Sequence, residues 1–395
     1  MATSKDIGTV VEANNKFGYD VYKLLSKASL EKSPNKPENI LLCPLSVETI
    51  LALTFVGAKG VTAEEMSTVL KFPNDACKVS NGFLDLTAQL KSKDVIIRIA
   101  NKVFVDKEVK LTEEFQQAAV KYFDSETESI DMKDKASLDK INGWVAQKTE
   151  NKIPTILEDL DDDTVSVLVN AIYFNGKWEN PFKTTPVPMQ FYLKPEESIE
   201  VPAIQRKGKY RYFEDETVQI VEIPYKGKEF SLIIALPREN GLPSTLEEIF
   251  PVDYQSKLDR EVEVDVTIPK FKIESKIDFT SILQEMGMTT AFSGEADFSG
   301  LIDPKSVRTN VAISKVIQKC FIDVNEEGTE AAAATAVQIV LLSASLEPIF
   351  AANIPFYFQL CHVKSGRMIF IGKCNNPMIE NENVFNPQAL NIQYL

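Results

Sequence analysis

The sequence predicts an α+β protein in which a helical N-terminal part packs on antiparallel sheets. Apolar residues recur at helical spacing early in the chain, and several later segments have the composition and alternation of strands. No Pro/Gly/Ser-rich linker of useful length divides the 395 residues, and no repeat of about 20 to 50 residues is present. With 44% hydrophobic residues the chain can bury a large core. We therefore expect residues 1–395 to form a single domain.

Two apolar stripes predict amphipathic helices. The first runs from Phe17 to Leu25, and the second runs from Ile141 to Val145. The polar stretch SKASLEKSPNKPEN, residues 26–39, follows the first stripe and predicts a loop. Both helices need a partner layer against which their apolar faces are buried.

Strands are expected to provide that layer. Strand signals occur in residues 95–105, 165–174, 220–225, 230–237, 261–271 and 359–372. In the fifth of these segments, apolar residues alternate with polar ones from Val262 to Ile268, which predicts a half-buried antiparallel strand.

The charge balance and the absence of long apolar runs exclude several partners. Lys and Arg number 43 against 57 Asp and Glu, and the net charge of −14 argues against nucleic acid or an anionic membrane surface. The chain has no run of about 18 apolar residues, so no membrane span is predicted. The N-terminal segment lacks the apolar part of a signal peptide. The five cysteines are scattered, and no Asn-x-Ser/Thr sequon occurs. We expect reduced thiols and a cytoplasmic protein, although a secreted protein given without its signal peptide would look the same.

The residues do not support a catalytic role. Ser-His-Asp and Cys-His sites need an imidazole base, and the one histidine, His362, lies in a segment predicted as a strand. The pattern S-x-x-K occurs at 29–32 and 33–36, but without the SDN or KTG sequences of penicillin-binding enzymes. No HExxH, GxSxG, P-loop, GxGxxG or zinc-ligand spacing is present. We expect no catalytic residue, metal or cofactor.

One segment near the C-terminus does not match an ordinary element. Residues 325–348 have the sequence NEEGTEAAAATAVQIVLLSASLEP, an apolar run between a turn-like Glu-Glu-Gly and polar, helix-breaking residues. Because alanine is the best helix former, a plain buried helix is one interpretation. Its place between two predicted strands, FIDV and IPFYF, favours a segment that is kept outside the core.

Nine strings occur in the order in which one protein family has them. They are NILLCPLSVETILALTFVGAKGVTAEEM, INGWVAQKTENKI, VSVLVNAIYFNGKWENPF, VEIPYKGKEFSLIIALP, TIPKFKI, MGMTTAFSGEADFSGL, VIQKCFIDVNEEGTEAAAATA, IPFYF and FIGKCNNP. With these strings the chain resembles the serpins from about residue 10 to Pro377. The resemblance implies three β-sheets, eight or nine helices and an exposed reactive-centre loop, here about residues 326–353. It also implies that a protease cleaves this loop, which then inserts into the central sheet as a new strand.

The resemblance places the hinge of the loop at its N-terminal end. The hinge residues are Glu326, Glu327, Gly328, Thr329, Glu330, Ala331, Ala332, Ala333 and Ala334. If Thr329 faces the core after insertion, Glu330 and Gln338 face solvent, whereas a shift of one residue buries the Glu330 carboxylate. Gly328 is expected to give the hinge backbone freedom, and the alanines add little bulk. The small, uncharged residue at position 329 predicts an inhibitory serpin.

The position of the hinge glycine predicts cleavage between Leu342 and Ser343, on family spacing. A leucine at the cut suits the apolar primary pocket of a chymotrypsin-like or elastase-like serine protease. A trypsin-like target is disfavoured because no Lys or Arg occurs from Gly328 to Asn353. The target protease, joined as a covalent acyl complex, is therefore the expected partner.

Three alternatives remain open from the sequence. Cleavage after Leu341 or Ala344 is an alternative to cleavage after Leu342. A papain-like cysteine protease, which recognises an apolar residue such as Leu341, is an alternative target. A non-inhibitory serpin that acts as a carrier or chaperone is an alternative function.

Two further residue sets follow from the family resemblance. Where insertion begins, the breach of the central sheet is matched by the pair Lys270 and Glu326 and by Trp178. The shutter beneath the opening strands is matched by Cys43, Ser46, Asn170 and Gln318. Cys43 stands where serine is usual and lacks a good hydroxyl hydrogen bond, and Gln318 stands where many members have histidine. We expect strand opening to work, but from a less stable closed state.

The last part of the chain extends past the usual end of a serpin. The tail, residues 380–395, has the sequence ENENVFNPQALNIQYL, and the residues assign no function to it. The uncharged, β-prone window VQIVLL in the loop makes polymerisation a hazard for a protein that we otherwise expect to be a monomer.

Overall fold

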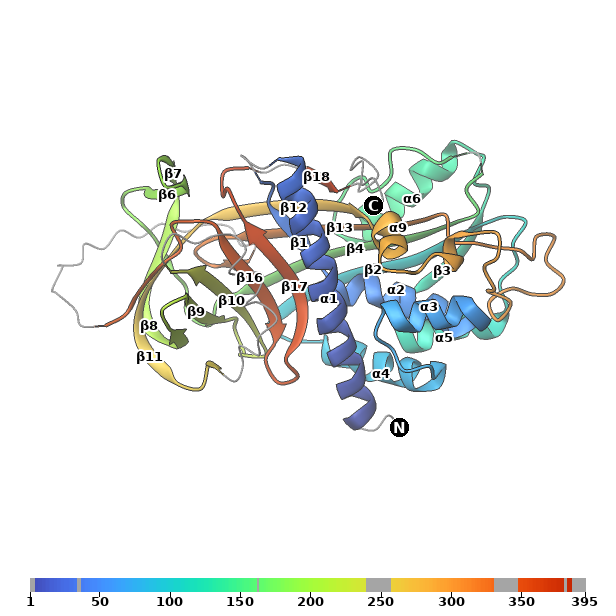
Figure 1. Ribbon diagram of the computed structural model, residues 1–395, viewed down its shortest axis with the longest axis horizontal. Coiled ribbons are helices and arrows are strands. Elements are labelled where there is room, and N and C mark those ends of the chain that lie inside the picture. Colours follow the sequence, from blue (N-terminus) through green and yellow to red (C-terminus); the bar gives the residue numbers. More distant parts are fainter. Residues whose placement is uncertain are drawn as a thin grey trace.

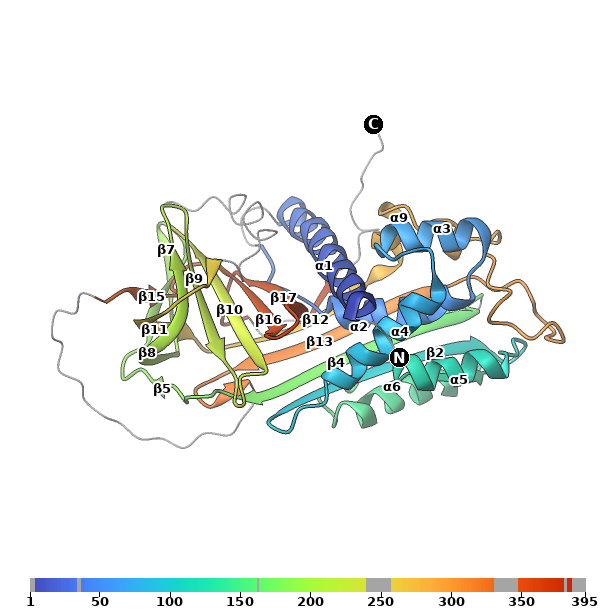
Figure 2. The same ribbon diagram turned by 90° about the horizontal axis from the view of Figure 1, so that it is seen from below.

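The computed structural model describes residues 4–33, 37–161, 163–238, 257–329, 347–379 and 382–385. Within these ranges the chain forms seven α-helices, one short 3-10 helix and three β-sheets (Figures 1 and 2). The predicted α+β class and the three sheets are confirmed. The expected number of helices, eight or nine, exceeds the seven that the described ranges contain.

The bounds of the elements are as follows. The helices are α1 (Ser4–Lys32), α2 (Pro44–Gly57), α3 (Gly60–Val69), α4 (Ala76–Gln89), α5 (Glu113–Phe123), α6 (Ala136–Lys148), α9 (Phe279–Glu285) and the 3-10 helix η1 (Thr290–Phe292). The strands are β1 (Ile40–Leu42), β2 (Val95–Asp106), β3 (Glu126–Ile130), β4 (Ser166–Lys177), β5 (Lys183–Thr184), β6 (Met189–Lys194), β7 (Glu197–Val201), β8 (Ala203–Glu214), β9 (Val218–Pro224), β10 (Phe230–Pro237), β11 (Glu261–Pro269), β12 (Phe271–Asp278), β13 (Lys315–Val324), β14 (Gly328–Thr329), β15 (Ile349–Ala351), β16 (Phe356–His362), β17 (Arg367–Cys374) and β18 (Glu382–Phe385).

The central sheet has seven strands in the order β18-β12-β13-β14-β4-β2-β3. Strands β2 and β4 pair antiparallel along almost their whole length, whereas β4 and β13 are parallel neighbours. Parallel strands at the centre of a sheet are covered on both faces, and β4 and β13 are almost continuously buried. The short strand β14 enters between them at one end only.

The second sheet has nine strands, with β1-β17-β16-β10-β9-β8-β11-β15 along its main path. Strand β11 pairs antiparallel with β8, and its apolar residues from Val264 to Ile268 are buried in alternation. The half-buried antiparallel strand predicted here is therefore confirmed. Strands β6 and β7 form a third, two-stranded sheet.

Two layers cover the central sheet on opposite faces. Helix α2 lies on one face and is buried all round: of its 14 residues only Val56 is not buried. Helix α6 lies on the other face, where Ile141 and Val145 belong to a separate apolar cluster with residues of β2, β4 and β13. Figure 2 shows α2 and α6 on the two sides of β4 and β13. The predicted helix around Ile141 is confirmed.

The loop predicted for residues 26–39 is wrong in its first half. Helix α1 continues to Lys32, because Ser26 and Ser29 lie on its packed face and are 1% and 2% exposed. The Ser29 hydroxyl accepts a hydrogen bond from the Glu38 amide at 3.1 Å, so the chain that follows folds back against the helix. This part of the helix was predicted as a loop because its composition is polar.

The segment 382–385 adds a strand to the edge of the central sheet. Strand β18 pairs parallel with β12, from Glu274 opposite Glu382 to Ile277 opposite Phe385. It therefore covers backbone groups that an edge strand would otherwise leave unpaired. In the part of the chain that the structure describes, no helix is both long and apolar enough to cross a membrane.

Candidate functional site

Two residues of the expected hinge, Gly328 and Thr329, form a short strand in the central sheet. Gly328 pairs with Lys177 of β4, and Thr329 pairs with Gly176 of β4 and with Val324 of β13. The Asn325 amide donates to the Gly328 carbonyl at 2.9 Å, which closes the turn between β13 and β14. Two residues of the loop thus lie between strands that are direct neighbours further along.

Gly328 is required here for close approach of two backbones. A Cβ at this position would lie 2.1 Å from the Gly176 carbonyl oxygen and 2.6 Å from the Lys177 Cα. Backbone atoms cannot move away as a flexible side chain can, so any other residue would push β14 off β4. The sequence predicted a glycine hinge for its conformational freedom, and the packing gives a second, steric reason.

Thr329 is held at the buried face of the sheet. It is fully buried, and its Oγ1 lies 2.7 Å from the Tyr225 hydroxyl. Tyr225 stacks on Trp178 with 4.6 Å between ring centroids. Burial raises the pKa of Tyr225, so the phenol is neutral and can donate or accept this bond. The sequence did not identify Tyr225, because an aromatic residue just after a strand end carries no periodic signal.

The three residues assigned to the breach meet around the turn that precedes β14. The Lys270 ammonium lies 2.6 Å from the Glu326 carboxylate, whose side chain is 14% exposed. The Trp178 indole donates to the Asn325 carbonyl at 2.9 Å, and its backbone amide donates to the Glu327 carbonyl at 2.9 Å. Burial alone would raise the pKa of Glu326, but the hydrogen bond and charge of Lys270 outweigh it and hold the pKa below its ordinary value.

Beyond the hinge the central sheet is closed. Strands β4 and β13 pair directly from Val167 opposite Lys315 to Tyr173 opposite Phe321. We call this run of pairs the seam. An inserted loop would replace the seam with two new ladders, one to each strand. Along the seam, no other described strand lies between β4 and β13.

The shutter residues form one buried network across the seam. The Gln318 side chain of β13 donates to the Asn170 side chain of β4 at 2.7 Å and to the Cys43 carbonyl at 2.8 Å, and it accepts from the Cys43 amide at 2.9 Å. The Asn170 amide in turn donates to Ser46 of α2 and to Asn101 of β2. The structure thus brings all four predicted residues together and adds Asn101. The signal for Asn101 in the sequence was a lone asparagine in the predicted strand VIIRIANKVFV.

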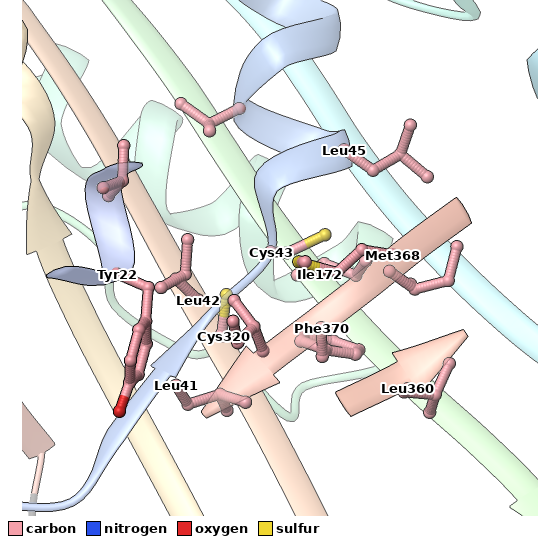
Figure 3. Packing of buried hydrophobic residues seen from close by; sticks show 14 of the residues in the cluster. Tyr22, Leu41, Leu42, Cys43, Leu45, Ile172, Cys320, Leu360, Met368 and Phe370 are labelled. Atoms are coloured by element: carbon pink, nitrogen blue, oxygen red, sulfur yellow. The ribbon is translucent and has the colours of Figure 1, made fainter. Parts of the chain in front are cut away.

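Cys43 precedes the first residue of α2 without capping it. Its side chain makes no capping hydrogen bond, and it packs among Leu42, Leu45, Ile172 and Cys320 (Figure 3). Burial raises the pKa of the Cys43 thiol, so it is a neutral, weak acceptor beside the first amides of the helix. All five cysteines are free thiols, and of these only Cys77 is exposed.

Two other ionisable groups, Glu48 and His362, are buried. Both carboxylate oxygens of Glu48 in α2 lack a hydrogen-bond partner among the described residues, and burial raises the pKa of Glu48 well above its ordinary value. His362 ends β16, as its segment predicted, and its Nδ1 lies 2.8 Å from the Ser365 hydroxyl. Burial and the nearby charge of Arg367 lower the pKa of His362 to about 4, which leaves it neutral at physiological pH.

The remaining predicted residues lie outside the described part of the chain. These are the hinge residues Glu330, Ala331, Ala332, Ala333 and Ala334, the bond between Leu342 and Ser343, and the alternative cleavage positions Leu341 and Ala344.

Known proteins are similar to this chain in sequence and in structure. A family model described as Serpin (serine protease inhibitor) matches residues 12–377. Serpin B6 of Pongo abelii is 34% identical over 93% of this chain and 99% of that protein. The leukocyte elastase inhibitor of Equus caballus is 35% identical over 92% of this chain and 98% of that protein. The crystal structure of Serpin48, a highly specific serpin of the insect Tenebrio molitor, matches with a TM-score of 0.81 and 33% identity over 93% of this chain and 98% of that one.

Proposed function

This chain belongs to the serpin family of serine protease inhibitors, and from that premise we propose that it inhibits a chymotrypsin-like or elastase-like serine protease. It acts as a monomer and as a suicide substrate, cleaved once between Leu342 and Ser343. The observation that carries the proposal is the hinge: Gly328 and Thr329 already lie between β4 and β13, at the head of a seam that a longer strand can enter.

The chemistry belongs to the protease. Its serine oxygen attacks the carbonyl carbon of Leu342, the peptide bond to Ser343 breaks, and the proton passes to the leaving amine. An ester then joins the protease to Leu342. This chain supplies the conformational step, because cleavage frees the loop from its C-terminal attachment and lets it follow Thr329 into the seam.

The register of β14 supports insertion with alternate residues inward. Continued along β4, the pairing of Thr329 with Gly176 would bring Thr335 opposite Asn170 and Ala331 opposite Phe174. Thr335 would then carry a hydroxyl to the shutter, where Asn170 loses Gln318 as its partner when the seam opens. Glu330 and Gln338 would both lie on the other face. In this register the Thr335 hydroxyl could replace Gln318 as the donor to the Asn170 side-chain oxygen.

Leu342 supports the choice of protease class. A leucine fills a deep apolar primary pocket, and the loop carries no Lys or Arg for a pocket with a buried carboxylate. The leukocyte elastase inhibitor of Equus caballus, a relative of this chain, bears the name of such a target. For a papain-like target the same loop would present Leu341 instead.

The test is incubation with chymotrypsin, elastase, trypsin and papain, followed by a denaturing gel. We expect an SDS-resistant adduct with chymotrypsin or elastase and none with trypsin. An adduct with papain alone would redirect the proposal to cysteine proteases. Loop cleavage by every enzyme without any adduct would overturn inhibition and favour a carrier or chaperone.

A matched substitution separates recognition from trapping. Leu342→Arg changes the residue at the cut and leaves the hinge unchanged. We expect this variant to form its adduct with trypsin and to lose the chymotrypsin adduct. If Leu342→Arg still traps chymotrypsin at the wild-type rate, cleavage occurs elsewhere, with Leu341 and Ala344 as the candidates.

A further inference from the structure

Two buried thiols meet at the shutter. Cys43 and Cys320 are both fully buried, and both are free. The Gln318 side chain is bonded to the amide and to the carbonyl of Cys43, and Cys320 follows two residues later on the same face of β13. Figure 3 shows Cys43 and Cys320 in one apolar cluster. The start of α2 and the middle of β13 therefore each bring a thiol to the same place.

The pKa of Cys320 shows how closely the two residues lie. Burial raises this pKa well above its ordinary value, and the Cys43 thiol raises it further. The Cys43 amide acts in the other direction, because it is near enough to donate to the Cys320 sulfur. Both effects need direct proximity of the two residues.

The surroundings of Cys43 combine burial with groups that stabilise a thiolate. Burial raises the pKa of the Cys43 thiol, so the thiol is neutral in the closed protein. Against burial act the Ser46 amide, the Arg367 guanidinium and the Leu45 amide, each of which lowers this pKa. Amides at the start of a helix and a nearby cation are the features that make a cysteine nucleophilic.

Arg367 of β17 has hydrogen-bond donors to spare. It is fully buried, and its Nε and Nη2 have no hydrogen-bond partner among the described residues. Its Nη1 donates to the Leu86 carbonyl of α4 at 3.5 Å. Burial lowers the pKa of Arg367 to about 10, which leaves the guanidinium charged at physiological pH. Its free donors and its charge can stabilise an anion that forms on Cys43.

Cys320 has a polar neighbour of its own. Ser275 of β12 pairs directly with Cys320, so the two side chains leave the sheet on the same face. Ser275 is fully buried, and its hydroxyl has no hydrogen-bond partner in the part of the chain that the structure describes. This hydroxyl can donate to the Cys320 sulfur when the thiol loses its proton.

We propose that Cys43 and Cys320 are a site of oxidation by hydrogen peroxide, where they form a disulfide that ties α2 to β13 and stabilises the closed shutter. The Cys43 thiolate attacks one peroxide oxygen, the O–O bond breaks, and the other oxygen leaves as water with the thiol proton. Cys43 is then a sulfenic acid. The Cys320 sulfur attacks the Cys43 sulfur, the S–O bond breaks, and the hydroxyl leaves as a second water with the Cys320 proton. Two thiols lose two electrons, and the peroxide gains them.

Opening of the seam controls this reaction, because peroxide must reach two buried thiols. When β4 and β13 separate, water enters the shutter and the effect of burial on the pKa of Cys43 falls. The helix amides and the Arg367 guanidinium remain beside the thiol, so the thiolate forms in the open shutter. We therefore expect slow oxidation of the closed protein and faster oxidation on mild heating. The inference goes beyond the proposed function and does not depend on it.

The disulfide holds together two segments that already contact each other. Gln318 joins β13 to Cys43 by two hydrogen bonds, and the bond from Cys43 to Cys320 adds a covalent link between the same segments. Because the two cysteines lie far apart in the sequence, the link also restricts the unfolded chain, which is one source of disulfide stabilisation.

The first test locates the disulfide. All proteins carry Cys77→Ser, which removes the exposed thiol. They are treated with hydrogen peroxide with and without mild heating, alkylated during denaturation, and mapped by mass spectrometry of unreduced peptides. We expect a disulfide between Cys43 and Cys320 that forms faster on heating. The control Cys361→Ser, which removes another buried thiol, should still form it, and absence of this disulfide would overturn the proposal.

Dimedone, which labels sulfenic acids, separates the roles of the two thiols. In Cys320→Ser, Cys43 should be labelled because no thiol remains to attack its sulfenic acid. Burial and the charge of Glu222 both raise the pKa of Cys361, so it is the internal reference. We expect about tenfold or more label at Cys43, since one pKa unit changes the thiolate fraction about tenfold. Equal label at Cys43 and Cys361 would contradict activation by α2 and Arg367.

Denaturant titration tests the effect on the closed protein. The oxidised protein should unfold at a higher denaturant concentration than the reduced protein, and dithiothreitol should remove the difference. Peroxide-treated Cys43→Ser is the control for oxidation elsewhere and should show no increase. A mapped disulfide between Cys43 and Cys320 without a higher midpoint would overturn the proposed stabilisation.

Discussion

The Thr329 hydroxyl and the Tyr225 hydroxyl lie 2.7 Å apart, and both side chains are fully buried where the loop enters the central sheet. Behind them Trp178 stacks on Tyr225 and donates to the Asn325 carbonyl. Thr329 is therefore fixed by a buried hydrogen bond, and the turn before it is fixed by an indole. Under the proposed function, this contact would position the rest of the loop for entry into the seam.

Thr329→Arg should convert the protein from an inhibitor into a substrate. A guanidinium at this position has no acceptor in a site built for one hydroxyl, and an unpaired buried charge costs several kcal/mol. With roughly a tenfold change for each 1.4 kcal/mol, the ratio of cleaved to trapped product should rise by about tenfold or more. Stoichiometric titration against chymotrypsin measures this ratio. Thr329→Val, which keeps the volume, should have a smaller effect; an equal effect would contradict the argument from charge.

Glu326→Lys should speed polymerisation on mild heating, because it places two ammonium groups at the breach. The wild-type ion pair also predicts acid sensitivity. The folded pKa of Glu326 is lowered from 4.5, so its contribution to stability is complete above pH 4.5 and is lost as the pH falls through the folded pKa. Polymer formation followed by native gel from pH 7 to pH 3.5 tests both statements. If Glu326→Gln polymerises at the wild-type rate at pH 7, the ion pair does not hold the breach.

Cys43→Ser should stabilise the closed state. Serine is among the best residues at the position before a helix, and its hydroxyl is a stronger acceptor for the first free amides of α2 than the thiol, which makes no capping hydrogen bond. We expect a gain of about 0.5–2 kcal/mol in the free energy of unfolding and slower heat-induced polymerisation. Denaturant titration measures the gain. Cys361→Ser, which replaces a buried thiol within a strand, is the control and should not stabilise the protein.

Glu48→Met should also stabilise the protein, and more so at higher pH. The folded pKa of Glu48 lies above its ordinary value of 4.5, so the folded state holds a proton that the unfolded state releases. Stability of the wild type therefore falls as the pH rises above 4.5. A methionine of similar shape removes this loss, with an expected gain of about 1–3 kcal/mol at pH 8 and less at pH 5. An equal gain in stability at pH 5 and at pH 8 would show that ionisation of Glu48 is not the cause of the gain.

Truncation after Ile379 should promote self-association. It removes β18 and leaves the outer edge of β12 unpaired, which is a site for strand addition by another copy. Truncation after Phe385 keeps β18 and is the matched control. Light scattering at equal concentration distinguishes the two, and equal scattering would show that β18 does not protect this edge.

Periodicity predicted those parts of the fold that are amphipathic. Strand β11, with its alternating valines, and helix α6, with its stripe from Ile141 to Val145, were both identified from their spacing. Helix α2 was not identified from spacing, because a helix that is buried on every side has no single apolar stripe to detect. The end of α1 was missed because its buried face there carries the serines Ser26 and Ser29.

The residues of the candidate site could be predicted where they lie in the strings that resemble the family. Residues that join the site only through tertiary contacts could not be predicted. Lys270, Glu326 and Trp178 meet around one turn, as the resemblance implied. Asn101 of β2 and Tyr225, just after β9, contact the predicted shutter and hinge residues from parts of the chain far away in the sequence.

The most direct test of the central claim is the mass of the species formed with chymotrypsin after denaturation. Inhibition by loop insertion predicts a covalent adduct of the protease with residues 1–342 and a released peptide that begins at Ser343. Two cleaved fragments of this chain beside free, active chymotrypsin would contradict it.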